Sequence, residues 1–179
     1  NPEIYVEKFI NNGRHIEVQV LGDKFGNYVH LGERECSVQR NNQKLIEECP
    51  SSFVDAELRE VLTSKSLDLA KKVNYVGAGT VEFLVDEDKN FYFIEMNTRI
   101  QVEHTVTEMV YMMDLVKEQI KMHYGKEMSF NQDMILSKGH SIECRLNAED
   151  PFNNFTPSPK KIDSLNFPGG IGVRKIGRA

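Results

Sequence analysis

The chain of 179 residues has the composition of a globular protein, with 40% hydrophobic and 27% charged residues. This length suits one domain or parts of two. The net charge of −5, without a lysine–arginine cluster, argues against nucleic acid as the main partner. No apolar run approaches the length of a membrane span, and no signal-peptide pattern opens the sequence, so we expect no membrane partner.

Cysteine usage predicts a reducing, cytosol-like compartment. The three cysteines are widely separated and odd in number, namely Cys36, Cys49 and Cys144. The sequence opens on Asn1 rather than methionine and ends without a closing element. We therefore expect a piece of a longer protein.

The first predicted elements form a hairpin. Apolar and polar residues alternate over 14–19, which predicts a strand with Ile16 and Val18 on one face. A turn over 22–27 leads to a second strand over 28–31. The polar stretch that follows, up to Pro50, is irregular in pattern and predicts a long loop, a kind of segment that often carries function.

Two helices are predicted from their periodicity and caps. The first begins at Ser52 or Asp55 and continues to about Val73. The second covers 115–124, with Asp114 as its cap. Between them, two β-rich runs flank a short polar turn over 86–90, which predicts a central hairpin.

This hairpin carries the strongest chemical signal. If its turn is centred near Asp88, Glu82 lies opposite Glu95 or nearly so, and like charges across strands destabilise a sheet. A hard cation removes that repulsion, and Glu82, Glu95 and Asn97 offer oxygen ligands that suit Mg²⁺. The alternative is a solvated face with ordinary surface glutamates, because a register slip of one residue reverses the face.

From Glu95 onward, polar residues occupy every second position of the hairpin's second strand and of the segment that leaves it. In an extended segment these side chains share one wall. They are Glu95, Asn97, Arg99, Gln101 and Glu103. No GxxxxGK[ST] motif occurs, so phosphate-holding groups would have to come from elsewhere. His15, Lys44 and Arg145 each have an ordinary explanation as a structural histidine, a solvated lysine and an ion-paired arginine.

The last elements are strands near 141–147 and 162–167, separated by a proline-rich passage. The order of hairpin, helix, hairpin, helix and further strands predicts the α+β class, with an antiparallel sheet and helices on one side. We place the domain boundary between residues 135 and 136.

Several runs, taken together and in order, strongly resemble biotin carboxylase over nearly the whole chain. They are VEKFI (6–10), RHIEVQV (14–20), GERECSVQRNNQK (32–44), GAGTVEF (77–83), FIEMNTRIQVEH (93–104) and ECRLNAEDP (143–151). EMNTRIQVEH is the most specific, since other ATP-grasp enzymes usually share only its E-x-N part. Two residues depart from the family pattern: Asn42 stands where histidine is frequent, and Thr105 where proline is frequent.

The resemblance implies an ATP-grasp fold, with residues 1–135 as the C-terminal portion of that domain and 136–179 as the beginning of the biotin carboxylase C-terminal domain. It implies a ligase that uses Mg²⁺ (or Mn²⁺), ATP and bicarbonate to carboxylate biotin on a biotin carboxyl carrier protein, through carboxyphosphate. In the family, the N-terminal domain, a glycine-rich lid and two ATP-binding lysines come before the part that matches Asn1. We therefore expect the isolated chain to be inactive.

The family's site residues transfer position by position. ATP contacts would come from Glu7, Lys8, Phe9, Ile10, His15, Gln39, Glu82, Leu84 and Glu95. Metal ligands would be Glu82, Glu95 and Asn97, and the bicarbonate pocket would contain Lys44, Arg99, Gln101 and Val102. Catalytic roles would fall to Arg99, to Glu103 as the base and to Arg145, which would stabilise the biotin enolate.

The resemblance also implies partners and a setting. They are a carboxyltransferase component, a homodimer of the full-length protein, and the cytoplasm, or a mitochondrial or plastid matrix in a eukaryote. The parent enzyme would be an acetyl-CoA, a propionyl-CoA or a pyruvate carboxylase, and membership of acetyl-CoA carboxylase would connect the protein to fatty acid biosynthesis. The alternatives are another ATP-grasp ligase, such as carbamoyl-phosphate synthetase, and a non-catalytic binding module derived from the fold.

Overall fold

The computed structural model describes residue 4 and residues 6–176. The chain divides into two compact units, one up to Arg145 and one from Leu146 on. The boundary expected between residues 135 and 136 stays a prediction. Among the described residues, no helix has both the length and the apolar character needed to span a membrane.

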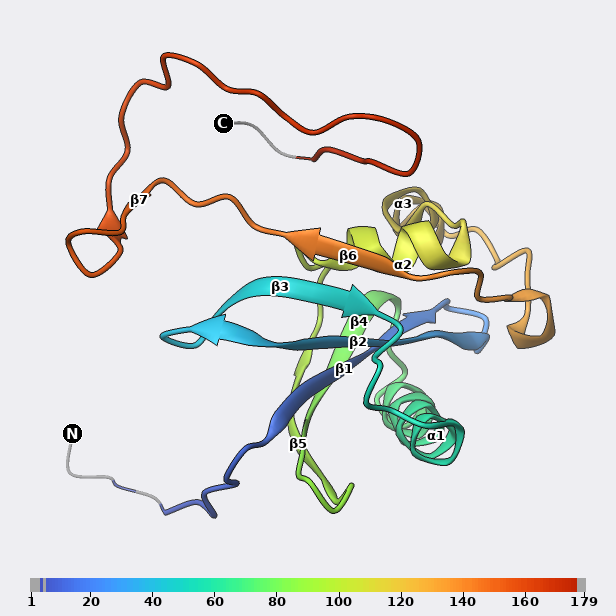
Figure 1. Cartoon of the computed structure of the whole chain (residues 1–179). Coiled ribbons are helices and arrows are strands. Elements are labelled where there is room, and N and C mark those ends of the chain that lie inside the picture. Colours follow the sequence, from blue (N-terminus) through green and yellow to red (C-terminus); the bar gives the residue numbers. More distant parts are fainter. Residues whose placement is uncertain (1–3, 5, 177–179) are drawn as a thin grey trace. The chain divides into compact units, whose positions relative to one another are not determined.

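The first unit is built on a six-stranded antiparallel sheet, in the order β5-β4-β1-β2-β3-β6 (Figure 1). The strands are β1 (Arg14–Gly22), β2 (Tyr28–Arg40), β3 (Gln43–Cys49), β4 (Gly77–Val85), β5 (Phe91–Asn97) and β6 (Ser141–Cys144). The two predicted hairpins, β1–β2 and β4–β5, are confirmed. This antiparallel sheet, together with the helices, confirms the α+β class predicted from the order of the elements.

The long loop predicted up to Pro50 is wrong, because most of this stretch forms strands β2 and β3. The reversal between them is made by Asn41 and Asn42, whose φ angles are 50° and 62°. Positive φ at both central residues is the signature of a tight hairpin turn, and asparagine tolerates it. Lys44 therefore belongs to a strand and not to a loop.

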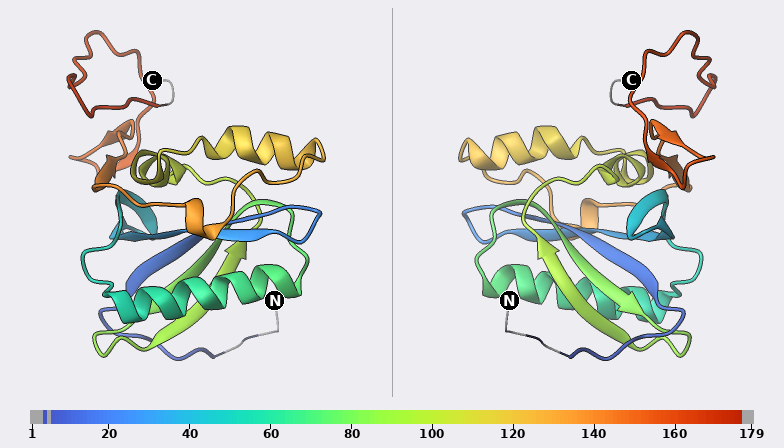
Figure 2. Two further views of the ribbon diagram at one scale, coloured as in Figure 1. Left: turned by 90° about the vertical axis from the view of Figure 1, so that its right-hand side faces the viewer. Right: turned by 90° about the vertical axis from the view of Figure 1, so that its left-hand side faces the viewer.

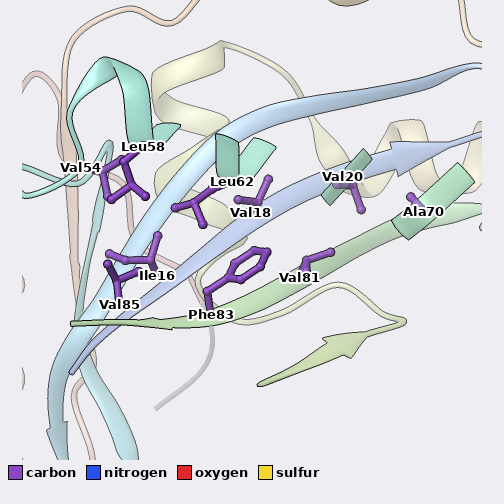
Figure 3. Close-up of a cluster of buried hydrophobic side chains, with 10 residues drawn as sticks. All are labelled: Ile16, Val18, Val20, Val54, Leu58, Leu62, Ala70, Val81, Phe83 and Val85. Carbon is purple, nitrogen blue, oxygen red and sulfur yellow. The ribbon is translucent and has the colours of Figure 1, made fainter. Parts of the chain in front are cut away.

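Helix α1 (Ala56–Lys72) packs on one face of the sheet. Its N-cap is Asp55, one of the two predicted caps, and the Asp55 carboxylate accepts a hydrogen bond from the Leu58 N–H at 2.9 Å. The apolar positions of β1 and β4 meet this helix in the main core (Figure 3). The core contains Ile16, Val18, Val20, Val54, Leu58, Leu62, Ala70, Val81, Phe83 and Val85.

Helices α2 (His104–Tyr111) and α3 (Leu115–His123) lie on the other face, so the expectation of helices on one side only needs correction (Figure 2). A second core joins Leu115 of α3 to Leu21 of β1. Leu21 follows Val20 and therefore points away from α1. The cap predicted at Asp114 is confirmed by its bond from the Lys117 N–H.

The remaining elements are short. A 3-10 turn, η1, covers Gln132–Met134. In the second unit, β7 (Glu149–Asp150) pairs with β8 (Thr156–Pro157). Residues 162–167 form no strand, contrary to the prediction. A strand needs a neighbour for its backbone hydrogen bonds, and the described part of this unit provides none there.

Candidate functional site

A row of charged side chains crosses four neighbouring strands on the face opposite α1. The strand registers place Arg34 of β2 opposite Glu17 of β1, and Glu17 opposite Glu82 of β4. Glu82 in turn lies opposite Glu95 of β5. Three carboxylates on adjacent strands repel one another, so this row requires cations close by.

A β-bulge in β5 sets the last pairing. Phe83 pairs with Phe93, but Glu82 pairs with Glu95, so Ile94 is an extra residue on that strand. Without the bulge Glu82 would face Ile94, and Glu95 would belong to the other face. Bulges of this kind re-aim side chains next to functional sites.

Lys44 neutralises the middle of the row. Its Nζ lies 2.5 Å from Glu17 Oε2, 2.7 Å from Glu103 Oε1 and 3.2 Å from Glu82 Oε1. Burial alone would lower the pKa of Lys44, but the charges of Glu17 and Glu103 outweigh it and raise that pKa above its ordinary value. Lys44 is therefore a permanent cation with three acidic neighbours.

Arg34, the member of the row on β2, is fully buried and pairs with Glu17. Its guanidinium donates to five side chains at 2.6–3.1 Å: Glu17, Gln19, Thr80, Gln101 and Thr107. Gln101 accepts from Arg34 through Oε1 and donates through Nε2 to Glu82 Oε1 at 2.7 Å. The Arg34 guanidinium can only donate hydrogen bonds, so the Gln101 amide must turn its oxygen toward Arg34. The amide N–H groups therefore point toward the row.

Glu103 lies at the junction of the row and a second ion-pair chain. It is buried, and its Oε2 accepts from Arg145 Nη2 at 2.9 Å. Arg145 also donates through Nε to Glu47 Oε1 at 2.6 Å. Burial raises the pKa of the Glu47 carboxyl to about 7, although the Arg145 guanidinium opposes the rise.

His15 lies on β1 two residues before Glu17, beside the middle of the row. Its Nε2 lies 2.8 Å from Glu82 Oε2, and its Nδ1 lies 3.2 Å from the Gln39 amide nitrogen. Burial alone would lower the pKa of His15, but contacts with Glu17 and Glu82 outweigh it and raise this pKa to about 9. Leu84 is the strand partner of His15 on β4.

The raised pKa of His15 predicts a pH-dependent stability. Folding strengthens proton binding, so the protonated ring stabilises the fold fully below its ordinary pKa of 6.5, and this contribution is lost as the pH rises through about 9. We expect the difference in unfolding free energy between the unsubstituted chain and His15→Gln to shrink over that range. Urea unfolding in EDTA between pH 6 and 10 measures it, and a difference independent of pH would contradict the ion pair.

The three predicted metal ligands converge on one point. The side-chain amide nitrogen of Asn97 lies 2.9 Å from Glu82 Oε1 and 2.9 Å from Glu95 Oε1. Turning that amide over presents its oxygen to the same place, which completes a donor set of oxygens only. Such a set fits Mg²⁺, which binds through one or two carboxylates and retains phosphate and water ligands.

Two other clusters have the spacing of metal ligands but the wrong chemistry. His15, Glu17 and Glu82 form the first, and Glu17, Cys36 and Glu103 the second. Glu17 is already engaged by Arg34 and Lys44, which hold its pKa well below the usual range although burial opposes this. Burial raises the pKa of the Cys36 thiol, which keeps it protonated and unsuited to a metal.

The structure does not bring every predicted site residue into this cluster. Arg99 and Val102 have exposed side chains, and the Arg99 guanidinium donates to the Ile100 carbonyl. Asn42 lies in the exposed β2–β3 turn. The extended wall expected to run from Glu95 through Glu103 ends at Asn97, because the chain leaves β5 there and begins α2 at His104.

The four residues predicted to hold adenine also lie outside the charged row. Glu7, Lys8, Phe9 and Ile10 precede β1 without regular secondary structure, and the Phe9 side chain is 86% exposed. Lys8 Nζ lies 3.2 Å from the Tyr92 hydroxyl. Residues 8–12 and 86–88 line an open hollow of about 210 Å³, which is smaller than ligand pockets of roughly 300–1,000 Å³.

Sequence reasoning missed Arg34 and Glu47, two buried members of the cluster. Both lie on strands that were interpreted as a loop, where side-chain direction has no regular pattern. The signal that could have found them is the Asn41–Asn42 pair, a favourable tight-turn sequence with polar strands on either side.

An antiparallel sheet, with an acidic hairpin and a row of paired charges on one face, agrees with the ATP-grasp fold that the resemblance implies. The model of the family described as carbamoyl-phosphate synthase L chain, ATP binding domain, matches residues 1–131. The chain belongs to this family, which confirms the predicted fold class.

The chain is also homologous to biotin carboxylases. It is 56% identical over 174 residues to the chloroplastic biotin carboxylase of Arabidopsis thaliana, and 55% identical over 175 residues to biotin carboxylase 1 of Bacillus subtilis. Each match covers 97% of this chain but 32% and 39% of the relative. The chain thus spans about a third of the length of the curated relatives that it matches.

A solved structure extends the similarity to three dimensions. The biotin carboxylase domain dimer of the Hydrogenobacter thermophilus 2-oxoglutarate carboxylase superposes with a TM-score of 0.91 and 54% identity. The match covers 94% of this chain and 37% of that one. That domain was solved in complex with MgADP, ADP and bicarbonate.

Proposed function

We propose that this chain is the part of a biotin carboxylase that holds magnesium, bicarbonate and the reacting phosphate of ATP. One observation carries the proposal: the buried carboxylate Glu103 lies within 3 Å of two cations, Lys44 and Arg145, beside the oxygen donors of the β4–β5 hairpin. A base, an anion site and a metal site in contact are what the activation of bicarbonate by ATP requires.

Glu103 is the base in this reaction. Its carboxylate takes the proton of the bicarbonate hydroxyl, whose oxygen then attacks the γ-phosphorus of ATP while the bond to ADP breaks, which gives carboxyphosphate. Lys44 and the N–H groups of Gln101 hold the bicarbonate anion. Arg99 and Val102 complete that pocket, and the exposed Arg99 guanidinium turns toward the anion when it binds.

In this proposal the ligands of the magnesium ion are Glu82, Glu95 and Asn97. The bound ion would neutralise the negative charge that develops on the phosphates. His15 and Gln39 bind the nucleotide near its ribose and phosphates, and Leu84 packs against the adenine. The backbone of Glu7, Lys8, Phe9 and Ile10 supplies the adenine contacts once this segment folds onto the nucleotide.

Arg145 serves the second half of the reaction. Carboxyphosphate breaks down to carbon dioxide and phosphate, the phosphate takes the proton of the biotin ureido nitrogen, and that nitrogen bonds to the carbon dioxide. The Arg145 guanidinium stabilises the enolate form of the biotin ureido group. The biotin is carried by a carrier protein, and a carboxyltransferase component receives the product. Acetyl-CoA carboxylase, and with it fatty acid biosynthesis in the cytoplasm or an organelle matrix, is the setting that we propose.

A second candidate function is carbamoyl-phosphate synthesis, favoured by the description of the matching family. A non-catalytic module is the third. The identity of 55–56% to biotin carboxylases supports the first function over both. A chimera tests it: this chain replaces the matching 175 residues of the Bacillus subtilis biotin carboxylase 1. We expect ATP cleavage that depends on bicarbonate and is stimulated by free biotin.

The three functions give different results in that assay. Cleavage that requires bicarbonate but ignores biotin would favour carbamoyl-phosphate chemistry. A folded chimera without ATP cleavage would favour the non-catalytic module. Circular dichroism and gel filtration of the chimera establish folding independently of activity.

Substituting Glu95 is expected to weaken magnesium binding in the same chimera. Glu95→Gln keeps the size of the side chain but removes one of two anionic ligands, so half-saturation with Mg²⁺ at fixed ATP is expected to rise at least about tenfold. The matched control is Glu87→Gln at the tip of the same hairpin, where the carboxylate accepts from Asn12. Equal magnesium dependence in the two variants would place the metal elsewhere.

A further inference from the structure

We propose that Glu47 is a positioning residue that takes over the Arg145 guanidinium when Glu103 accepts a proton. The inference rests on the proposed function, and it assigns a role to a buried acid that the reaction as described above does not use. It explains how Arg145 stays in place for biotin while its other partner loses its charge.

Arg145 is held between two acids that approach different nitrogens. Glu47 Oε1 lies 2.6 Å from Nε, and Glu103 Oε2 lies 2.9 Å from Nη2. The Arg145 side chain is 24% exposed, whereas those of Glu47 and Glu103 are 0% and 3% exposed. The two buried acids thus hold the guanidinium on its protein side, and the exposed part of the Arg145 side chain is accessible to a ligand.

One carboxylate oxygen of Glu47 is available to accept a further hydrogen bond. This oxygen, Oε2, is buried and has no hydrogen-bond partner among the described residues. A buried acceptor without a partner is costly and calls for an explanation. Nε and Nη2 form one edge of a guanidinium, and that edge matches the two oxygens of a carboxylate. A small rotation would move Nη2 from Glu103 to the free Oε2, which makes the Glu47–Arg145 pair bidentate.

The distribution of charge favours this exchange. When Glu103 takes the bicarbonate proton, it becomes neutral and loses its attraction for both Lys44 and Arg145. Lys44 still has Glu17 and Glu82. Arg145 keeps its bond to Glu47. The other acid close to this pair is Glu143, the strand partner of Glu47, and it accepts from the Thr105 hydroxyl.

An ordinary structural ion pair would predict a different outcome, and the two halves of the reaction separate the possibilities. Cleavage of ATP with bicarbonate but without biotin does not need Arg145 in place. In the chimera, Glu47→Gln is therefore expected to leave this cleavage within about twofold, and to reduce the stimulation by biotin at least about tenfold. Glu47→Asp, which keeps the charge, is expected to recover part of it.

The matched control is Glu143→Gln, which lies across the strand pair and is expected to leave the stimulation unchanged. A parallel loss of both activities in Glu47→Gln would show a merely structural role and overturn the proposal. Unchanged biotin stimulation would overturn it as well.

A structural experiment decides the question even if the chimera shows no biotin carboxylation, which would count against the proposed function alone. Glu103→Gln in this chain imitates the protonated base, because its one carbonyl oxygen is uncharged. A crystal structure of this variant is expected to show Arg145 Nη2 within hydrogen-bond distance of Glu47 Oε2. If Nη2 stays with the side chain at position 103, the exchange does not occur.

Discussion

Replacing Arg34 with methionine is expected to lower the free energy of unfolding by about 3–5 kcal/mol, the range measured when one partner of a buried ion pair is removed. The guanidinium is fully buried and donates to five side chains. Without it, the buried Glu17 loses one of its two close cations, and Gln101 and Thr107 lose a donor. Methionine fills a similar volume, so the effect reports charge and hydrogen bonding more than a cavity.

Urea unfolding followed by circular dichroism measures this loss. The double variant Arg34→Met, Glu17→Gln is expected to recover part of it, because no unpaired charge remains. Lys121→Met breaks a partly exposed pair with Glu118 on α3 and serves as the control, with little change expected. A loss below about 1 kcal/mol for Arg34→Met, the value of a surface pair, would contradict the buried network.

Replacing Glu103 with glutamine is expected to reduce bicarbonate-dependent ATP cleavage by the chimera by about 100- to 10,000-fold, the usual contribution of a general base. The variant is expected to fold, since glutamine still offers an oxygen to Lys44 or Arg145. The affinity for MgADP is expected to change little, because the proposed metal ligands are untouched.

Initial rates of ADP release, with titration calorimetry for MgADP, provide the measurement. Glu57→Gln on the exposed surface of α1, which covers the opposite face of the sheet, is the matched control. If Glu103→Gln kept more than about a tenth of the activity, Glu103 would not be the base.

The central hairpin was predictable because its signals are local. Two β-rich runs around residues 86–90 determine a turn, and the turn restricts which residues can face one another. The opposition of Glu82 and Glu95 is confirmed, although it depends on the extra residue at Ile94. No pattern in the sequence predicts that bulge, because one inserted residue leaves the alternation of polar and apolar positions ambiguous.

The strands β2 and β3 show where local reasoning failed. Their polar positions include Glu33, Arg34 and Glu47, all of which are buried. A polar strand normally indicates a surface, since burying an isolated charge is costly. These residues violate the expectation because each finds its partner on another element, as Arg34 does on β1 and α2.

The amino-acid sequence alone determined the class of the fold, the capped helices α1 and α3, and the acidic hairpin, because caps, periodicity and turns act over a few residues. Through its resemblance it also indicated the family. Only the tertiary structure decided that helices cover both faces of the sheet and that Lys44 is shared among three acids. It alone joined Glu47 to Arg145, 98 residues apart in the chain. Electrostatic contacts of this kind depend on which strands become neighbours and on what water is excluded, and neither is written in any local stretch of residues.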